Sequence, residues 1–235
     1  TDYQSDVHIS NEILKQISES YRKIRNTARY ILGNVYDFNP DTDSVPVNEL
    51  MPMDKWAIVK LNELIAKVKQ AYDNYEFHQV YHSIRNFCVI DMSNFYLDVL
   101  KDRLYTEKSD SKSRKAAQTA IYIILNAMTR MISPILAYTS DEIWKYMPHS
   151  SNENAENVIF NEMPNQVEIK TDADFMSFWD EIHQLRDDVK KSLEGLIKDK
   201  TIKSSLEAKV TLKASGEKLE FLKKAEPELA AAFIV

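Results

Sequence analysis

The densest group of side chains able to do chemistry lies in SYRKIRNTARYILGN, residues 20–34, which has four basic residues and no acidic one. The four basic residues are Arg22, Lys23, Arg25 and Arg29. A guanidinium group can bind a phosphate through two parallel hydrogen bonds and can stack on the face of a base. Asn26 adjoins these cations and offers both a donor and an acceptor to a base edge. This stretch therefore has the chemistry to hold the backbone and the bases of a nucleic acid.

A long helix has to position these side chains, and the pattern of apolar residues predicts one over residues 10–36. Ser10 is a suitable N-cap, and Glu12 lies near the positive end of the helix dipole. The apolar positions recur at alternating steps of four and three: Ile17, Tyr21, Ile24, Ala28, Ile31 and Val35. At about 100° per residue, the three arginines fall within an arc of about 60°, roughly 110° from this apolar stripe. We therefore expect them to face solvent side by side.

A solvated helix face accounts for the same cations without any ligand. Charged helix faces are common, and Glu19 or acids on neighbouring helices could pair with the arginines. The whole chain is acidic, with 30 Lys+Arg against 36 Asp+Glu, whereas nucleic-acid binders are usually basic. Because residues 151–235 carry most of the negative charge, residues 1–150 are nearly neutral. A nucleic acid would have to bind through the local basic patch.

Composition predicts a helical protein with a genuine core. The chain has 235 residues, of which 44% are hydrophobic, and only three are glycine. Scarce glycine disfavours hairpins and phosphate-binding glycine-rich loops. The single cysteine, Cys88, excludes an internal disulfide and fits a reducing compartment. No signal peptide is evident, and no apolar run approaches the roughly 18 residues that span a bilayer, so we expect a cytoplasmic protein without a membrane partner.

Residues 1–149 are expected to form an antiparallel helix bundle. After the first helix, apolar periodicity predicts helices over 54–74, 76–104, 114–132 and 139–147. Thr139 and Glu142 have the spacing of a capping box at the start of the last of these. Four or five helices with short connections are typical of such a bundle.

Residues 150–235 are expected to form a small α/β appendage. VIFNEMP (158–164) and AAAFIV (230–235) resemble short strands, and a helix is predicted over residues 174–198. SSLEAKVTLKAS (204–215) alternates apolar and polar residues, with the period of a half-buried strand. The fold class predicted for the whole chain is therefore mainly α with an α/β C-terminal appendage. The apolar ending suggests that this appendage is cut short.

No catalytic or metal-binding constellation is predicted. HQVYH places His78 and His82 on one helix face, but Gln79 stands where a zinc protease needs its catalytic glutamate. Cys88 lies within the apolar stretch FCVI, where a buried small hydrophobe is expected. We therefore expect neither catalytic residues nor metal ligands in this chain.

Five stretches between residues 21 and 212 carry a resemblance to a known family. They are YRKIRNTARYILGNVYDF (21–38), MDKWAIVKLNELI (53–65), AYDNYEFHQVYHSIRNFCVIDMSNFYLDVLKDRLY (71–105), RKAAQTAIYIILNAMTRMISPILAYTSDEIWKYMP (114–148) and SLEAKVTL (205–212). In this order they resemble the anticodon-binding domain of the isoleucyl-tRNA synthetase family, within the class I aminoacyl-tRNA synthetases. The stretches KDRLY and SLEA point most strongly to isoleucine.

The resemblance implies that the chain belongs to an isoleucine–tRNA ligase, which attaches isoleucine to its tRNA using ATP. The expected partners are the anticodon stem-loop of the tRNA and the catalytic core of the same parent chain. The HIGH and KMSKS signatures of the ATP site are absent from this sequence. ATP and Mg²⁺ are therefore expected as cofactors of the parent enzyme, with zinc as a further candidate, and no cofactor is expected in this chain.

Together with the resemblance, the chemistry and position of the basic residues suggest which of them contact the tRNA. The first group is the patch that opened this section: Arg22, Lys23, Arg25, Asn26 and Arg29. Lys101 and Arg103, at the end of the third predicted helix, are further candidates for the stem backbone, as are Lys112, Arg114 and Lys115 beyond the next loop. Trp56 is expected to be a core residue rather than a stacking platform.

Two alternatives stay open on the sequence. One is the same bundle from a valine, leucine or methionine synthetase, which share this architecture. The other is a non-catalytic helical scaffold for protein interactions, whose basic patch would meet an acidic partner.

Overall fold

The computed structural model describes every residue except 1, 4–5, 7–8 and 235. The chain divides into two compact units, Thr1–Lys170 and Thr171–Val235. The described residues are mainly helical and contain no β-strand. The expected helical fold is therefore confirmed, whereas the α/β character of the C-terminal part is not.

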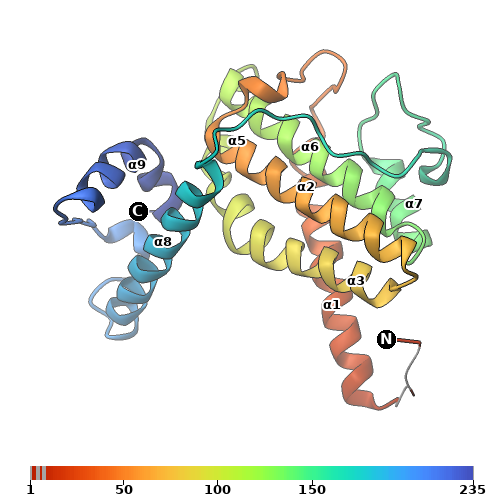
Figure 1. The fold of residues 1–235 in the computed structure, drawn as a ribbon, viewed down its shortest axis with the longest axis horizontal. Coiled ribbons are helices and arrows are strands. Elements are labelled where there is room, and N and C mark those ends of the chain that lie inside the picture. Colours follow the sequence, from red (N-terminus) through yellow and green to blue (C-terminus); the bar gives the residue numbers. More distant parts are fainter. Residues whose placement is uncertain (1, 4–5, 7–8, 235) are drawn as a thin grey trace. The chain divides into compact units, whose positions relative to one another are not determined.

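Unit 1 is a helix bundle, as predicted. Its long helices are α1 (Asn11–Leu32), α2 (Pro52–Asp73) and α6 (Lys112–Ile132), joined by the shorter α3 (Phe77–Asn86) and α7 (Ala137–Tyr146). Figure 1 shows α2 lying between α3 and α6, with α1 crossing behind them. The core includes Trp56, whose ring packs edge-on against Phe95 with 5.0 Å between centroids. Trp56 is thus a core residue, as expected.

Helix α1 begins and packs largely as its sequence predicts. The Ser10 hydroxyl accepts a hydrogen bond from the backbone N–H of Ile13, 3.2 Å away, and so caps the helix. Ile24, Ala28 and Ile31 are buried. Ile17, expected in the buried stripe, is 45% exposed, because the first turns of α1 extend beyond the other helices of the bundle (Figure 1).

The third predicted helix is not a single α-helix. After α3 the chain forms a π-helix, η2 (Phe87–Tyr96), followed by α4 (Leu97–Val99) and α5 (Lys101–Thr106). A π-helix is wider than an α-helix, and such segments occur frequently at functional sites. Here the π-helix meets α1 at Ser93, whose Oγ lies 3.4 Å from Thr27 Oγ1. Directly after it, the Leu97 carbonyl of α4 accepts a hydrogen bond from the Tyr30 hydroxyl at 3.1 Å.

The capping box predicted at Thr139 and Glu142 is wrong. Helix α7 begins at Ala137, so Thr139 lies inside its first turn and cannot serve as the N-cap. The Thr139 hydroxyl instead lies 3.1 Å from the Tyr21 hydroxyl and joins α7 to α1.

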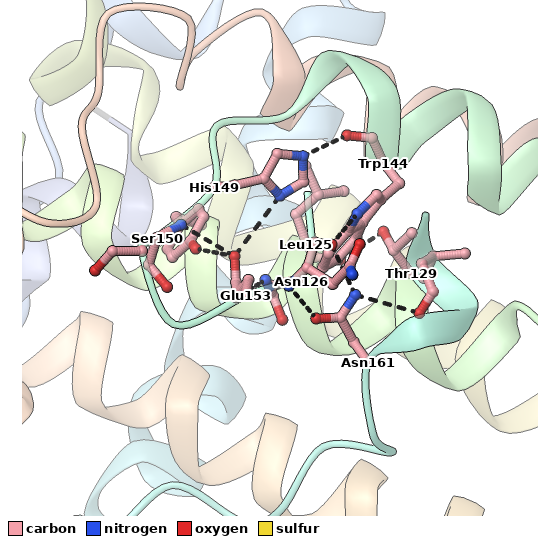
Figure 2. A network of polar contacts seen from close by, with 12 residues as sticks. Leu125, Asn126, Thr129, Trp144, His149, Ser150, Glu153 and Asn161 are labelled. Atoms are coloured by element: carbon pink, nitrogen blue, oxygen red, sulfur yellow. Dashed lines mark hydrogen bonds and ion pairs between the residues drawn. The ribbon is translucent and has the colours of Figure 1, made fainter. Parts of the chain in front are cut away.

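Residues 150–170 lie with the bundle in unit 1, whereas the sequence analysis assigned them to the second domain. The centre of their attachment is Glu153, whose carboxylate accepts hydrogen bonds from side chains of α6 (Figure 2). Farther along, the Asn62 side chain of α2 both donates to and accepts from the backbone of Val167. The predicted strand at 158–164 is instead a short 3₁₀ turn, η3 (Val158–Phe160), within the described residues.

Unit 2 consists of α8 (Phe175–Lys198), a 3₁₀ turn η4 (Ser205–Glu207) and α9 (Glu217–Phe233). The buried Arg186 donates through Nε to the Ala232 carbonyl at 2.7 Å, which ties the two helices together. The strand predicted over 204–215 is absent, because alternation alone cannot make a strand without a neighbouring strand to hydrogen-bond with. The strand predicted for AAAFIV is also wrong for the described residues, since α9 runs through to Phe233.

Candidate nucleic-acid interface

Helix α1 presents its cations to solvent, as predicted. Arg22, Lys23, Arg25, Asn26 and Arg29 are all exposed, and we call these five residues the basic strip. In the part of the chain that the structure describes, none of the four cations forms an ion pair. Arg22 donates only a long hydrogen bond, 3.4 Å, to the Ser18 hydroxyl. The strip therefore keeps its hydrogen-bonding capacity available for an anionic ligand.

The basic residues proposed beyond the strip are paired with carboxylates. Lys101 lies 2.7 Å from Asp98, Lys112 lies 2.8 Å from Glu49, and Lys115 pairs with Asp43. Arg114 is buried and lies 2.9 Å from Asp37. Burial alone would raise the pKa of Asp37, but hydrogen bonds from Arg114 and Gln118 outweigh it and hold that pKa below its usual value. These pairs make Lys112, Arg114 and Lys115 weaker phosphate ligands than the strip.

The structure does not bring Arg103 to this surface. Its guanidinium donates two hydrogen bonds of 2.8 Å to the carboxylate of Asp54, which is fully buried. Its remaining contacts are to the side chain and backbone of Ser113, and Tyr96 donates to the same carboxylate at 2.8 Å. Arg103 therefore has a structural role that the sequence reading missed, and we remove it from the candidate interface.

A groove of about 300 Å³ lies beside the strip, between α1 and residues 93–101. Its lining residues are Lys23, Asn26, Thr27, Tyr30, Ser93, Leu97, Asp98 and Lys101. Burial raises the pKa of the Tyr30 hydroxyl, which therefore remains a neutral donor to the Leu97 carbonyl. The groove thus brings together Lys23, Asn26 and Lys101, which the sequence analysis proposed separately. Nothing in the sequence pattern indicated that its second wall would be formed where the π-helix gives way to α4 and α5.

A second hollow, of about 200 Å³, has a different electrostatic character. It lies between α2 and the helices that follow it, and its lining includes Lys60, Glu63, Lys67 and Asp91. Burial raises the pKa of Asp91 to about 6; Lys60 opposes that shift and Glu63 adds to it. Because the two lysines of this hollow are balanced by two carboxyl groups, it lacks the uncompensated positive charge of the strip.

The raised pKa of Asp91 predicts a pH-dependent cost to stability. Because folding disfavours its charged form, stability is lost as pH rises from near 4 through the folded pKa of about 6. We expect Asp91→Asn to be more stable than the unmodified chain at pH 7, by about 1 kcal/mol after allowance for solvent screening. At pH 4, Asp91→Asn and the unmodified chain should have the same free energy of unfolding. Urea titrations at both pH values measure this, with the exposed Asp73→Asn as control, and an Asp91→Asn gain that did not change with pH would contradict it.

The histidines and the cysteine are also candidate ligands or nucleophiles by residue type. No group of three or more His, Cys, Asp or Glu able to hold a metal ion occurs among the described residues. His78 lies 3.9 Å from Asp2, while His82 is exposed. Burial raises the pKa of the Cys88 thiol to about 12, so Cys88 is an inert core residue, as expected. Within the described residues, no helix is both long and apolar enough to cross a membrane.

Comparison with known proteins decides which kind of domain this is. A family model described as the anticodon-binding domain of tRNA ligase matches residues 54–212, well over half of the chain. The chain belongs to this family. The matched region begins within the first turn of α2. The basic strip on α1 precedes this region in the sequence and is not part of the match.

Curated relatives extend the similarity of this anticodon-binding domain to α1 and the strip. Isoleucine–tRNA ligases from Caldanaerobacter subterraneus subsp. tengcongensis and Syntrophotalea carbinolica are each 47% identical, over 234 and 235 residues. The isoleucine–tRNA ligase of Desulforamulus reducens is 48% identical over 234 residues. Each comparison covers the full chain but only 25% of the relative. The chain therefore spans about a quarter of the length of the curated relatives it matches.

Proposed function

We propose that this domain holds the anticodon stem-loop of an isoleucine tRNA through the basic strip of α1. The observation that carries the proposal is the set of three exposed arginines on one helix face, without ion-pair partners among the described residues. Arginine suits this function because it binds phosphate bidentately and stacks on unpaired bases. Proteins recognise RNA loops mainly through such unpaired bases. Phosphate contacts would supply affinity and orientation, and base contacts would supply discrimination.

The domain would act within a larger isoleucine–tRNA ligase that uses ATP and Mg²⁺ in the cytoplasm to attach isoleucine to the tRNA. The names of the full-chain relatives support isoleucine over valine, leucine or methionine. They also disfavour a protein-interaction scaffold. In this proposal the catalytic part of the parent chain performs the chemistry. The domain described here makes and breaks no bond; it positions the tRNA.

A single arginine in the strip is expected to matter measurably. Arg25→Ala should weaken binding to an isoleucine anticodon stem-loop hairpin by about 1–3 kcal/mol, because it removes a charge-assisted contact. If Arg25 contacts a phosphate, the slope of log K against log salt should also become shallower by about 0.7. Fluorescence anisotropy with the labelled hairpin, repeated across a salt series, measures both effects.

The matched control is Lys67→Ala, which removes an exposed cation of α2 at the second hollow, away from the strip. It should leave affinity and salt slope almost unchanged. If Arg25→Ala and Lys67→Ala weakened hairpin binding equally, the effect would come from the overall charge, and a localised interface would be refuted. A hairpin with a scrambled anticodon that bound equally well would refute base readout.

A further inference from the structure

We propose that the groove beside the strip receives one unstacked base of the bound RNA, and that Asp98 makes the groove selective for a base rather than a phosphate. The base would carry an exocyclic amino group. This inference rests on the proposed function and deepens it, because it identifies which part of a nucleotide enters which part of the surface.

The position of the groove links it to the strip. Asn26 and Lys23 line the groove and belong to the strip at the same time. Asn26 lies one helical turn from Arg22, about 6 Å along the axis, so both contact points are within the reach of one nucleotide. A nucleotide whose phosphate is bound by the strip can therefore turn its base toward the groove.

The walls of the groove suit a planar, polar ring. Leu97 and Tyr30 supply an apolar wall, which is fixed by the hydrogen bond from the Tyr30 hydroxyl to the Leu97 carbonyl. The Asn26 amide and the Ser93 hydroxyl supply both donors and acceptors. The volume of about 300 Å³ lies at the lower end of the range for small-molecule sites and can accommodate a base.

The charges of the groove and the strip differ in one respect that decides what can enter. Lys23, which the groove shares with the strip, has no carboxylate partner among the described residues, whereas Lys101 on the opposite wall is held by Asp98 at 2.7 Å. The Asp98 carboxylate therefore offsets the charge of Lys101 and disfavours a phosphate at that wall, so the RNA backbone is favoured on the side of Lys23 and the strip. The same carboxylate can accept a hydrogen bond from a base amino group. Uracil lacks that group and would be disfavoured.

The test uses the 235-residue chain and the same RNA hairpin, with abasic sites introduced one at a time in its loop. In the unmodified chain, one abasic position should weaken binding about tenfold, on the scale of a single stacked and hydrogen-bonded base. In Asn26→Ala, that same abasic site should cost nothing further, because its partner has already been removed. Other loop positions should show no coupling to Asn26.

Asp98→Asn tests the selectivity separately. We expect the hairpin to bind no more weakly, the salt dependence to become steeper as Lys101 is released, and the preference for an amino base over uracil at the coupled position to fall about tenfold. The control is Asp102→Asn, which removes the same charge from an exposed position on α5 outside the groove.

The outcomes separate this inference from the function on which it rests. If the unmodified chain did not bind the hairpin at all, both the strip proposal and the base site would be overturned. Normal binding without any abasic position coupled to Asn26, or identical behaviour of Asp98→Asn and Asp102→Asn, would overturn the base site and leave the strip proposal intact.

Discussion

Replacing Asp54 with asparagine is expected to lower the free energy of unfolding by about 3–5 kcal/mol, the usual cost of removing one partner from a buried ion pair. Asp54 is fully buried, and its two oxygens accept three hydrogen bonds, two from Arg103 and one from Tyr96. Asparagine keeps the volume but offers only one acceptor oxygen, and its amide group would point N–H donors at a guanidinium. The loss is therefore electrostatic and not a packing defect.

The consequences of this change should extend over one end of the bundle. Asp54 lies in the first turn of α2, Tyr96 ends the π-helix, and Arg103 belongs to α5. Arg103 also binds Ser113 at the start of α6, so one carboxylate fixes four helical segments. Burial alone would lower the pKa of Arg103, but its contacts with Asp54 outweigh burial and raise it. A guanidinium remains charged in proteins even without such a partner, so Asp54→Asn would leave a poorly compensated buried cation.

Urea unfolding followed by circular dichroism measures the effect, and Glu49→Gln is the matched control. Glu49 forms an exposed pair with Lys112 at 2.8 Å, and exposed pairs contribute little to stability. The control should therefore unfold at the same urea concentration as the unmodified chain. An Asp54→Asn chain as stable as the control would show that Arg103 finds another partner, and would remove this cluster from the explanation of the fold.

The same cluster shows where sequence reading succeeded and where it failed. Periodicity located every long helix of the bundle, because burial of one apolar face dominates helix packing. It also placed the arginines of α1 correctly, since their direction follows from helical geometry alone. Arg103 could not be assigned in this way. Whether a cation faces water or a buried carboxylate depends on a residue about fifty positions away, which local pattern does not reveal.

The remaining errors have the same origin. The second wall of the groove lies where the π-helix gives way to α4 and α5, and this break in the helix leaves no local signature in the sequence. Asn26 and Lys101 were nevertheless singled out individually. The alternating residues of 204–215 satisfy the pattern of a strand, but strand formation is decided by a partner that the sequence does not identify. Thr139 has the right chemistry and spacing for a cap, yet α7 begins two residues earlier. In each case tertiary context overrode a local preference.

Glu153→Gln is expected to produce the second large effect, a loss of about 2–4 kcal/mol, because it breaks a partly buried charge network. One oxygen of Glu153 accepts from Asn126 at 2.5 Å and from Arg130 at 2.9 Å. The other accepts from the Tyr122 hydroxyl at 3.0 Å and from the backbone N–H of Ser150 at 3.1 Å. In glutamine, the remaining carbonyl oxygen can accept hydrogen bonds at one of these two positions. At the other position, the amide N–H groups would face the donors that Glu153 now accepts from.

Unlike the Asp54 cluster, this network attaches one segment to an otherwise complete bundle. Figure 2 shows Glu153 in the loop that follows α7, pointing toward Asn126 on α6. The same loop is held by Trp144, whose indole N–H donates to the Asn154 carbonyl at 3.0 Å, and by Asn161 within the loop, whose amide donates to Asn154 and Asn157. Loss of Glu153 should therefore release the segment before the bundle unfolds.

Hydrogen exchange separates this local effect from a global one. Amides of residues 150–161 should exchange faster in Glu153→Gln, while those of the buried α6 core keep most of their protection. Glu156→Gln is the control, because Glu156 lies in the same loop with its side chain exposed. If exchange rose equally across α6 and the loop, the segment would be an integral part of the bundle's folding unit. If it rose in neither, the Glu153 network would not be what attaches the segment.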